Sequence, residues 1–285
     1  MNNFLVKEKM AEFLKEDFGI ADLNSIWLPQ QEINGYFIAK EDGIICGQQI
    51  PSATYELLGN ATYTPLIADG SKVTKGTKIG QVKGLAASVL GGERVILNLL
   101  QRMSAIATKT HYLNAKLNDP TIKLTDTRKT LPGLRMFDKY AVSCGGGHNH
   151  RFDLTGAIML KDNHIAACGH SIATAVACIR QKQGPLTPIE VEVETKEQLL
   201  QAIAADVEVI MFDNQPPEVI KEWRKLVPEH IKIEASGGIN AETLPQFKGC
   251  GANFLSLGCL TNEVAVFDIS FLLTDAIKAD NPLTK

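Results

Sequence analysis

Basic side chains concentrate in one stretch of the sequence, and their types suit a particular ligand. Residues 122–164 contain seven Lys and Arg against four Asp and Glu, together with three of the six histidines. The planar guanidinium of Arg grips carboxylates through two parallel hydrogen bonds, whereas the ammonium of Lys acts on phosphate as a point charge. Because the whole chain has a net charge of -3, this stretch predicts a site for a small anion rather than a nucleic-acid partner. The candidate cations are Arg128, Lys129, Arg151 and Lys161.

Acidic residues and glycines follow other β-rich runs of the same half of the chain. Glu194 ends IEVEVE and Asp213 ends VEVIMFD, where both carboxylates could hold a Mg²⁺ that a pyrophosphate also ligates. Each acid could instead cap the next helix or balance the cations through ion pairs. Glycines beside a helix amino terminus leave N–H groups free to bind phosphate, and SGGI and SLG could do so here. The candidate phosphate-binding residues are Ser236, Gly237, Gly238 and Gly258.

The elements that must position these residues alternate in type. Short β-rich runs (IKLTDT, AIMLKD, IEVEVET, VEVIMFD, IKIEASG and NFLSLG) are separated by windows of helical pattern. This alternation predicts a parallel sheet of the kind that closes into an α/β barrel. Because only six or seven strands are found instead of eight, the barrel is expected to be open and incomplete. In such barrels the loops after the strands form the active site. The helical windows are 171–182, 196–205, 217–226 and 241–247.

The first part of the chain has a different rhythm. An amphipathic helix at about 6–14 precedes GYFIAKEDGIICG and DGSKVTKGTKIGQVKG, whose turn residues predict short antiparallel strands. A helix at about 87–117 follows, with its apolar residues on one face and Arg94 elsewhere. A last helix, at about 266–279, is expected to return to this first domain. The predicted organisation is therefore an N-terminal α/β sandwich domain over 1–110, a catalytic α/β barrel domain over 111–265, and a C-terminal helix within 266–285 that completes the sandwich.

Other function classes lack their signatures. No apolar run reaches the roughly 18 residues of a membrane span, and the amino terminus has no secretory h-region, so a cytoplasmic protein without a membrane partner is expected. The six cysteines contain no CxxC pair and are expected to be buried thiols. Walker A, GxGxxG and GxSxG motifs are missing. His148 and His150 form an HxH pair like that of metal-dependent amidohydrolases, but in a Gly-rich loop without further histidine ligands.

Several blocks of the sequence together resemble one enzyme family. ERVILNLLQRMSAIAT, TRKTLPGLRMFDKYAV, GGGHNHRFDLTGAIMLKDNH, VEVET, FDN, EASGGI and SLGCLT are similar to segments of the nicotinate-nucleotide pyrophosphorylases, the decarboxylating quinolinate phosphoribosyltransferases of NAD biosynthesis. A molybdenum-associated paralogous family, which shares part of TRK and HR but lacks KDNH, is the alternative enzyme. A catalytically silent barrel that senses phosphorylated metabolites is the alternative from another class.

The resemblance also implies roles for individual residues. It implies an α/β sandwich and an open barrel in a homodimer, with Arg94 reaching the partner subunit's site. It implies that Glu194 and Asp213 hold the ribose and the Mg²⁺-bound pyrophosphate, and that phosphoribosyl pyrophosphate (PRPP) and quinolinate react without an organic cofactor. Lys129, Lys161, Glu194 and Asp213 are the implied catalytic residues. Quinolinate and PRPP are implied to bind Arg128, Lys129, His150, Arg151 and Lys161, and the 5-phosphate is implied to bind Ser236, Gly237, Gly238 and Gly258.

Two positions depart from the pattern of that family. Ala105 of SAIAT stands where the family often has Gly, and LTNE at 260–263 replaces the frequent LTHS. The second departure puts in doubt the contacts that immediately follow Gly258.

Overall fold

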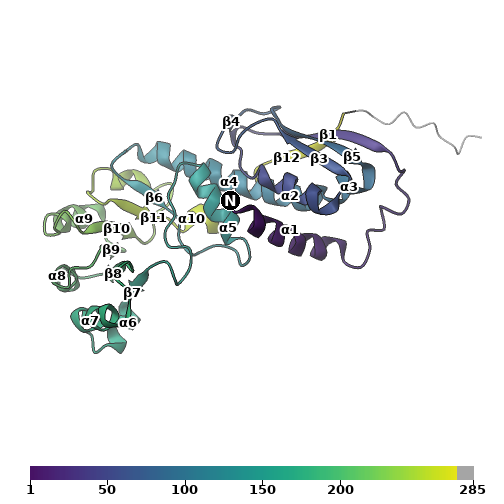
Figure 1. The fold of residues 1–285 in the computed structure, drawn as a ribbon. Helices are drawn as coiled ribbons and strands as arrows, with labels where there is room; N and C mark the ends of the chain where they lie inside the picture. Colours follow the sequence, from purple (N-terminus) through teal and green to yellow (C-terminus); the bar gives the residue numbers. More distant parts are fainter. Residues whose placement is uncertain (275–285) are drawn as a thin grey trace, which may run out of the picture. The chain divides into compact units, whose positions relative to one another are not determined.

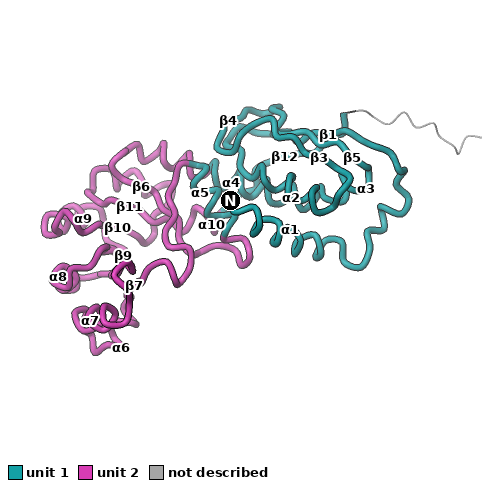
Figure 2. Tube along the Cα trace, viewed as in Figure 1, with its two compact units in different colours: residues 1–108, 136–145, 264–285 teal, residues 109–135, 146–263 magenta. Residues whose placement is uncertain are grey.

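The computed structural model describes residues 1–274, which divide into two compact units (Figure 2). Unit 1 comprises 1–108, 136–145 and the described residues from 264 onward, and unit 2 comprises 109–135 and 146–263. The predicted boundaries at 110 and 265 fall beside these bounds. The prediction differs at 136–145, which it assigned to the barrel domain and which packs within unit 1.

Unit 1 is built on an antiparallel sheet with helices (Figure 1). Its strand order is β12-β1-β5-β3, with a separate two-stranded sheet of β2 and β4. The strands are β1 (Glu32–Ala39), β2 (Gly43–Ile44), β3 (Ala61–Pro65), β4 (Lys72–Val73), β5 (Lys78–Leu85) and β12 (Ile269–Leu273). The helices are α1 (Asn3–Phe18), α2 (Gln49–Leu58), α3 (Ala86–Gly91), α5 (Arg135–Cys144) and α4 (Glu93–Leu117), of which α4 continues into unit 2.

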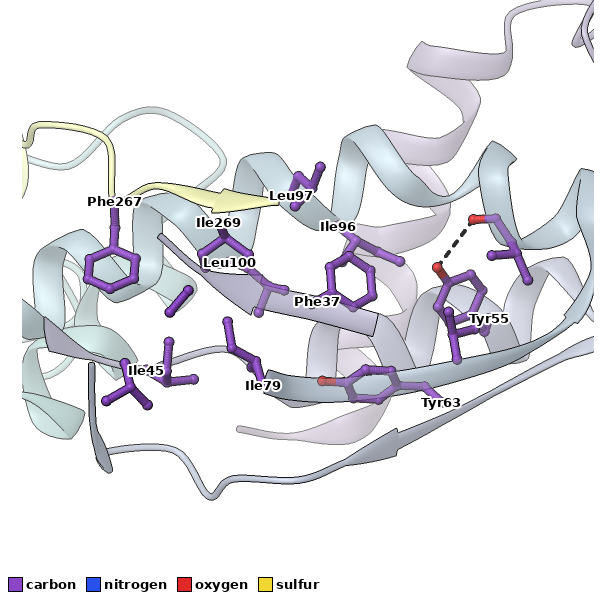
Figure 3. Packing of buried hydrophobic residues seen from close by; sticks show 14 of the residues in the cluster. Phe37, Ile45, Tyr55, Tyr63, Ile79, Ile96, Leu97, Leu100, Phe267 and Ile269 are labelled. Carbon is purple, nitrogen blue, oxygen red and sulfur yellow. Dashed lines mark hydrogen bonds between the residues drawn. The ribbon is translucent and has the colours of Figure 1, made fainter. Parts of the chain in front are cut away.

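The core of unit 1 lies against one face of this sheet (Figure 3). Residues of β1 alternate between buried and more exposed positions, and Phe37 on the buried side is fully enclosed. Ile79 of β5 and Leu100 of α4 belong to the same cluster. Tyr55 is also buried there, and its hydroxyl donates a 3.2 Å hydrogen bond to the carbonyl of Val89. The alternation is the pattern of a sheet with one face on the core.

Two predicted helices of this unit are wrong in form. The predicted helix at 87–117 is broken into α3 and α4 at the Gly91–Gly92 pair, where glycine weakens helix continuity. Within the predicted helix at 266–279, Ile269–Leu273 is instead β12, which pairs antiparallel with the open edge of β1. Its sequence ISFLL suits a strand, and Gly35 of β1 lets Phe271 approach, since a Cβ there would lie 2.2 Å from its ring. Residues 275–279 lie outside the described part of the chain.

Unit 2 is a parallel six-stranded sheet in the order β6-β11-β10-β9-β8-β7. The strands are β6 (Lys123–Thr125), β7 (Ile158–Leu160), β8 (Ile189–Val193), β9 (Val209–Asp213), β10 (Lys232–Ser236) and β11 (Phe254–Ser256). The helices are α6 (Asp162–Ala167), α7 (Ile172–Lys182), α8 (Lys196–Ala204), α9 (Pro217–Arg224), α10 (Cys259–Asn262) and a 3-10 turn, η1 (Leu244–Phe247), within the predicted window at 241–247. Since β6 and β7 are edge strands, the sheet is open, as predicted.

Register in the parallel sheet collects polar residues on one face. Successive side chains of a strand point to opposite faces, so register partners share a face. Glu192, Met211 and Glu234 are partners on three neighbouring strands, and Asp213 and Ser236 are partners two residues further along. The apolar, buried residues of the other face include Val191, Ile210 and Ile233. None of the helices in residues 1–274 is long and apolar enough to cross a membrane.

Candidate active site

A cavity of about 690 Å³ opens at the carboxyl ends of the strands of unit 2. Its wall is formed by the last residues of the strands and by the loops that follow them, because these segments meet at one edge of a parallel sheet. The predicted site residues that line it are Arg128, Lys129, His150, Arg151, Lys161, Asp213, Ser236, Gly237, Gly238 and Gly258. Arg94 and Glu194 are not among its lining residues.

The cations of the cavity come from three separate segments. Arg128 and Lys129 follow β6, Arg151 follows the isolated β-bridge at His148, and Lys161 follows β7. Lys161 directly follows β7, and its Nζ lies 2.5 Å from Oε2 of Glu192. The backbone carbonyl of Lys129 accepts a 2.8 Å hydrogen bond from the hydroxyl of Thr261, which holds the loop after β6. Burial, and then the neighbouring Arg128 guanidinium, lower the pKa of Arg151. A concentration of positive charge of this kind suits an anionic ligand.

The turn after β10 requires glycine for two reasons. Gly237 and Gly238 have φ angles of +98° and +62°, in the region that L residues rarely adopt. A Cβ on Gly237 would also lie 2.1 Å from Oδ1 of Asn214. Gly258 allows a similar close approach, because a Cβ there would lie 2.9 Å from Cδ of Lys129. The backbone at these glycines is therefore exposed to the cavity without side chains to cover it.

The acidic side of the cavity differs from the prediction at one residue. Asp213 lines the cavity, and burial and then the Glu192 carboxylate raise its pKa, an effect that Lys161 opposes. Glu192, not the predicted Glu194, lines the cavity on β8. The strand ends at Val193, and the backbone N–H of Glu194 donates to Oε1 of Gln198 in the capping box of α8. The chain thus turns away, leaving Glu194 exposed, although its carboxylate still contributes to raising the pKa of Asp213.

The predicted His150 belongs to a buried cluster with two acids, Glu190 and Glu234, that the sequence reasoning missed. Nε2 of His150 lies 3.1 Å from Oε2 of Glu190 and 3.4 Å from Oε1 of Glu234. Ser256 donates a short hydrogen bond to Glu234 and is linked to Thr125 by a 2.6 Å contact between their hydroxyl oxygens. The sequence signal that could have found the two acids is the alternation along a strand. Glu234 stands two residues before the predicted Ser236, and Glu190 stands four residues before the predicted Glu194.

The histidine of this cluster is held from the loop after β6. Oδ1 of Asp126 accepts a 2.8 Å hydrogen bond from the backbone N–H of His150, and Oδ2 accepts one of 2.7 Å from the Asn149 side chain. Asp126 is fully buried. Among the described residues, the metal-competent group here contains His150, Glu190 and Glu234 but not His148, which is exposed. The two histidines of the HxH pair therefore do not form a shared metal site.

Three further positions from the sequence lie in different places. Arg94 lies in unit 1, at a hollow of about 500 Å³ whose other lining residues include Leu23 and Trp27. Ala105 is buried in the core of unit 1. Asn262, of the departure LTNE, lines the cavity of unit 2, as does the next residue, Glu263. That departure therefore changes the wall of the site itself.

Comparison with known proteins identifies relatives over nearly the whole chain. The family models described as the N-terminal and C-terminal domains of quinolinate phosphoribosyl transferase match residues 22–104 and 106–272. A protein of Bacillus subtilis named a probable nicotinate-nucleotide pyrophosphorylase (carboxylating) is 49% identical over 276 residues, covering 96% of this chain and 95% of its own. A mitochondrial quinolinate phosphoribosyltransferase (decarboxylating) of Nicotiana tabacum is 37% identical over 287 residues, covering 93% of this chain and 81% of its own.

A solved structure agrees with these sequence matches. The nicotinate-nucleotide pyrophosphorylase of Francisella tularensis superposes with a TM-score of 0.90 at 35% identity, over 96% of this chain and 97% of that one. The similarity covers both units and includes the segments that line the cavity. The chain therefore belongs to the quinolinate phosphoribosyl transferase family.

Proposed function

We propose that this protein is a decarboxylating quinolinate phosphoribosyltransferase, which makes nicotinate mononucleotide, CO₂ and pyrophosphate from quinolinate and PRPP. The observation that carries the proposal is the composition of one cavity. It combines Arg and Lys side chains, a glycine turn with exposed backbone and a carboxylate at adjacent strand ends. This set matches a substrate pair with two carboxylates on one member and three phosphoryl groups on the other.

Quinolinate is proposed to bind through two arginines that line the cavity. Arg128 and Arg151 are close enough for one to lower the pKa of the other, and two guanidinium groups suit two adjacent carboxylates. The guanidinium of Arg151 is oriented by a 2.9 Å hydrogen bond from Nη1 to the carbonyl of Ala157. His150 contributes to the same wall. Two guanidinium groups in fixed positions would orient the ring nitrogen toward the ribose, which lowers the entropic part of the activation barrier.

PRPP is proposed to bind along the opposite part of the wall. Backbone N–H groups at Gly237 and Gly238 suit the 5-phosphate, together with Ser236 and Gly258. Mg²⁺ enters with the pyrophosphate group as part of this substrate. Asp213 fits that ion, because a half-buried carboxylate beside other acids gains by facing a divalent cation. Glu194 stays the second proposed ligand because it directly follows β8, although it is not among the residues that line the cavity.

The chemistry then follows from the charges that the chain supplies. As the pyridine nitrogen attacks C1 of the ribose and pyrophosphate leaves, Lys129 and Lys161 stabilise the departing negative charge. The ring nitrogen is now cationic, so it stabilises the electron pair that remains at the adjacent carbon when the carboxylate leaves as CO₂. The ring acts as its own electron sink, and no organic cofactor is needed.

A homodimer with Arg94 contributed across the interface is the proposed assembly. Arg94 lies at a hollow beside a segment with unusually exposed apolar side chains, among them Leu23 (74% exposed) and Trp27 (70% exposed). Large exposed apolar groups gathered beside a charged residue are typical of a protein interface. The proposed location is the cytoplasm, and no nucleic-acid or membrane partner is proposed.

The experiment that tests the function is a defined incubation. Purified protein is mixed with quinolinate, PRPP and Mg²⁺, and nicotinate mononucleotide is quantified by chromatography. Formation of the mononucleotide, dependent on all three components and abolished in Lys161→Ala, supports the proposal. PRPP consumption with another acceptor but not with quinolinate would favour the molybdenum-associated alternative, and ligand binding without turnover would favour a sensor.

A further inference from the structure

Two buried acids lie close together beside the cavity, and the reaction steps above assign neither of them a role. Glu190 of β8 and Glu234 of β10 have side chains only 6% and 5% exposed. Their oxygens and the Nε2 of His150 all lie within 4.8 Å of one another. Glu234 forms part of the cavity lining. A carboxyl group that is almost wholly buried and still reaches a reaction cavity is a candidate for proton transfer.

The hydrogen bonds of His150 fix where its proton lies. Nδ1 accepts a 2.8 Å hydrogen bond from the backbone N–H of Arg151, so this nitrogen carries no proton. Nε2, on the other side of the ring, faces both acids. One ring nitrogen donates a single hydrogen bond, so it cannot satisfy two carboxyl groups at once.

One carboxyl oxygen of the cluster lacks a hydrogen-bond donor. Oε1 of Glu190 is buried and has no hydrogen-bond partner. Two ionised carboxylates this close in a buried site repel each other strongly. A single proton held by the pair removes that repulsion, and it offers the orphaned oxygen a hydrogen. The geometry therefore favours one retained proton on the Glu190–Glu234 pair.

The surroundings of Glu234 support the same conclusion. Burial, and then the Glu190 carboxylate, raise the pKa of Glu234 to about 7, with a smaller contribution in that direction from Asp126 of the loop after β6. His150 and the Ser256 hydroxyl act in the opposite direction. The other charged groups that line the cavity are Glu192 on β8, Asp213 on β9, Arg128, Lys129, Arg151, Lys161 and Glu263.

The proposed reaction needs a proton at one defined point. Loss of CO₂ breaks the bond between C2 and its carboxyl carbon and leaves the electron pair on C2, next to the cationic nitrogen. That pair must take up a proton before nicotinate mononucleotide can leave. Lys161 lies 2.5 Å from Glu192 and is assigned to the leaving pyrophosphate in the proposed reaction, whereas Glu234 reaches the cavity from the buried cluster.

We propose that Glu234 is the acid that protonates C2 after decarboxylation, with Glu190 and His150 positioning it. The O–H bond of Glu234 breaks as the C2–H bond forms, and the resulting carboxylate takes a proton from water once the product has left. This inference rests on the proposed function, since it assigns a group to one of its steps.

The test measures single turnovers with enzyme in excess over quinolinate, at saturating PRPP and Mg²⁺, across the pH range from about 5.5 to about 9. Because the acid must be protonated, the wild-type rate should fall as pH rises through about 7. Ser256→Ala removes a hydrogen bond that stabilises the ionised form, so the fall should move to higher pH. Glu190→Gln removes the repelling charge, so the fall should move to lower pH.

Glu234→Gln, which keeps shape and size, should lower the single-turnover rate about a hundredfold and abolish this limb of the pH profile. Its quinolinate affinity, measured by calorimetry, should stay within about threefold of wild type. If Glu234 had a purely structural role, the Ser256 and Glu190 variants would lower the rate, but the pH at which the rate falls would not move in opposite directions in the two. The proposal is overturned if the limb is missing from wild type, stays fixed in those two variants, or persists in Glu234→Gln. If wild type makes no nicotinate mononucleotide at all, the proposed function itself fails.

Discussion

Alanine should be tolerated very differently at the two adjacent glycines of the turn after β10. A Cβ on Gly237 would lie 2.1 Å from Oδ1 of Asn214 and 2.8 Å from the backbone nitrogen of the same residue. A Cβ on Gly238 would meet no heavy atom within 4 Å. Both residues have positive φ angles, so both substitutions carry conformational strain, but only the first also carries steric overlap with fixed backbone.

The expected magnitudes follow from that difference. Gly238→Ala places an L residue in the left-handed region and should cost about 1–2 kcal/mol of stability. Gly237→Ala must also displace Asn214, whose N–H donates a 2.9 Å hydrogen bond to the carbonyl of Ser236, so a loss of about 3 kcal/mol or more is expected. Because a shift of about 1 Å in a binding group can cost about a hundredfold, kcat/KM for PRPP should fall by that factor in Gly237→Ala and by less than about tenfold in Gly238→Ala.

Urea unfolding and steady-state kinetics measure the two consequences separately. Gly249→Ala is the matched control, because Gly249 has a φ of +68°, no heavy atom near its Cβ position and no place in the cavity wall. The Gly249→Ala variant should lose about as much stability as Gly238→Ala, and its kcat and KM should equal those of the wild type. Equal kinetic losses in the two turn variants, or a normal KM for PRPP in Gly237→Ala, would refute the assignment of this turn to the 5-phosphate.

Three further predictions concern the rest of the site. Nicotinate, which lacks the carboxylate at C2, should be turned over at least about a hundredfold less efficiently than quinolinate because the guanidinium groups proposed to bind that carboxylate would lack their partner, and comparable kcat/KM values would contradict this. Asp213→Asn should lower kcat more than it weakens quinolinate binding, and an unchanged kcat would leave Asp213 a helix-capping or ion-pairing role only. Arg94→Ala and Lys161→Ala should each be nearly inactive, whereas an equimolar mixture of the two with random subunit pairing should recover about one quarter of wild-type activity; no recovery despite demonstrated subunit exchange would remove Arg94 from the partner's site.

Much of the barrel and its mouth was predictable because strand ends leave a local signature. Lys161, Asp213 and Gly258 each follow an apolar β-rich run, and parallel strands bring such positions to one edge. The glycine turn after IKIEA was recognisable for the same reason. These inferences need only the order of residue types along the chain, because a residue that follows a strand in the sequence also lies at the end of that strand in the fold.

The exact acid on β8 was not predictable from strand ends alone. Glu190, Glu192 and Glu194 alternate along one run, and any of them could be the residue at the mouth. The choice depends on where the strand stops, which Thr195 and Gln198 set by forming the capping box of α8. Counting back from the strand ends in steps of two would have pointed to the buried acids as well, since residues two apart share a face.

Tertiary pairing decided the remaining differences. The segment ISFLL has enough apolar residues to suit either a helix or a strand, and the free edge of β1 makes it a strand. The assignment of α5 to unit 1 likewise depends on contacts distant in sequence, such as the bidentate pair of Arg102 with Asp138 at 2.8 Å. Neither partner was visible from local pattern.

The most direct test of the central claim follows the carboxyl carbon at C2 of quinolinate. Purified enzyme is given quinolinate labelled at that carbon, with PRPP and Mg²⁺, and labelled CO₂, pyrophosphate and nicotinate mononucleotide are counted in the same reaction. The account predicts equal amounts of all three, with none in Lys161→Ala. Release of pyrophosphate without labelled CO₂, or retention of the label in the nucleotide, would contradict it.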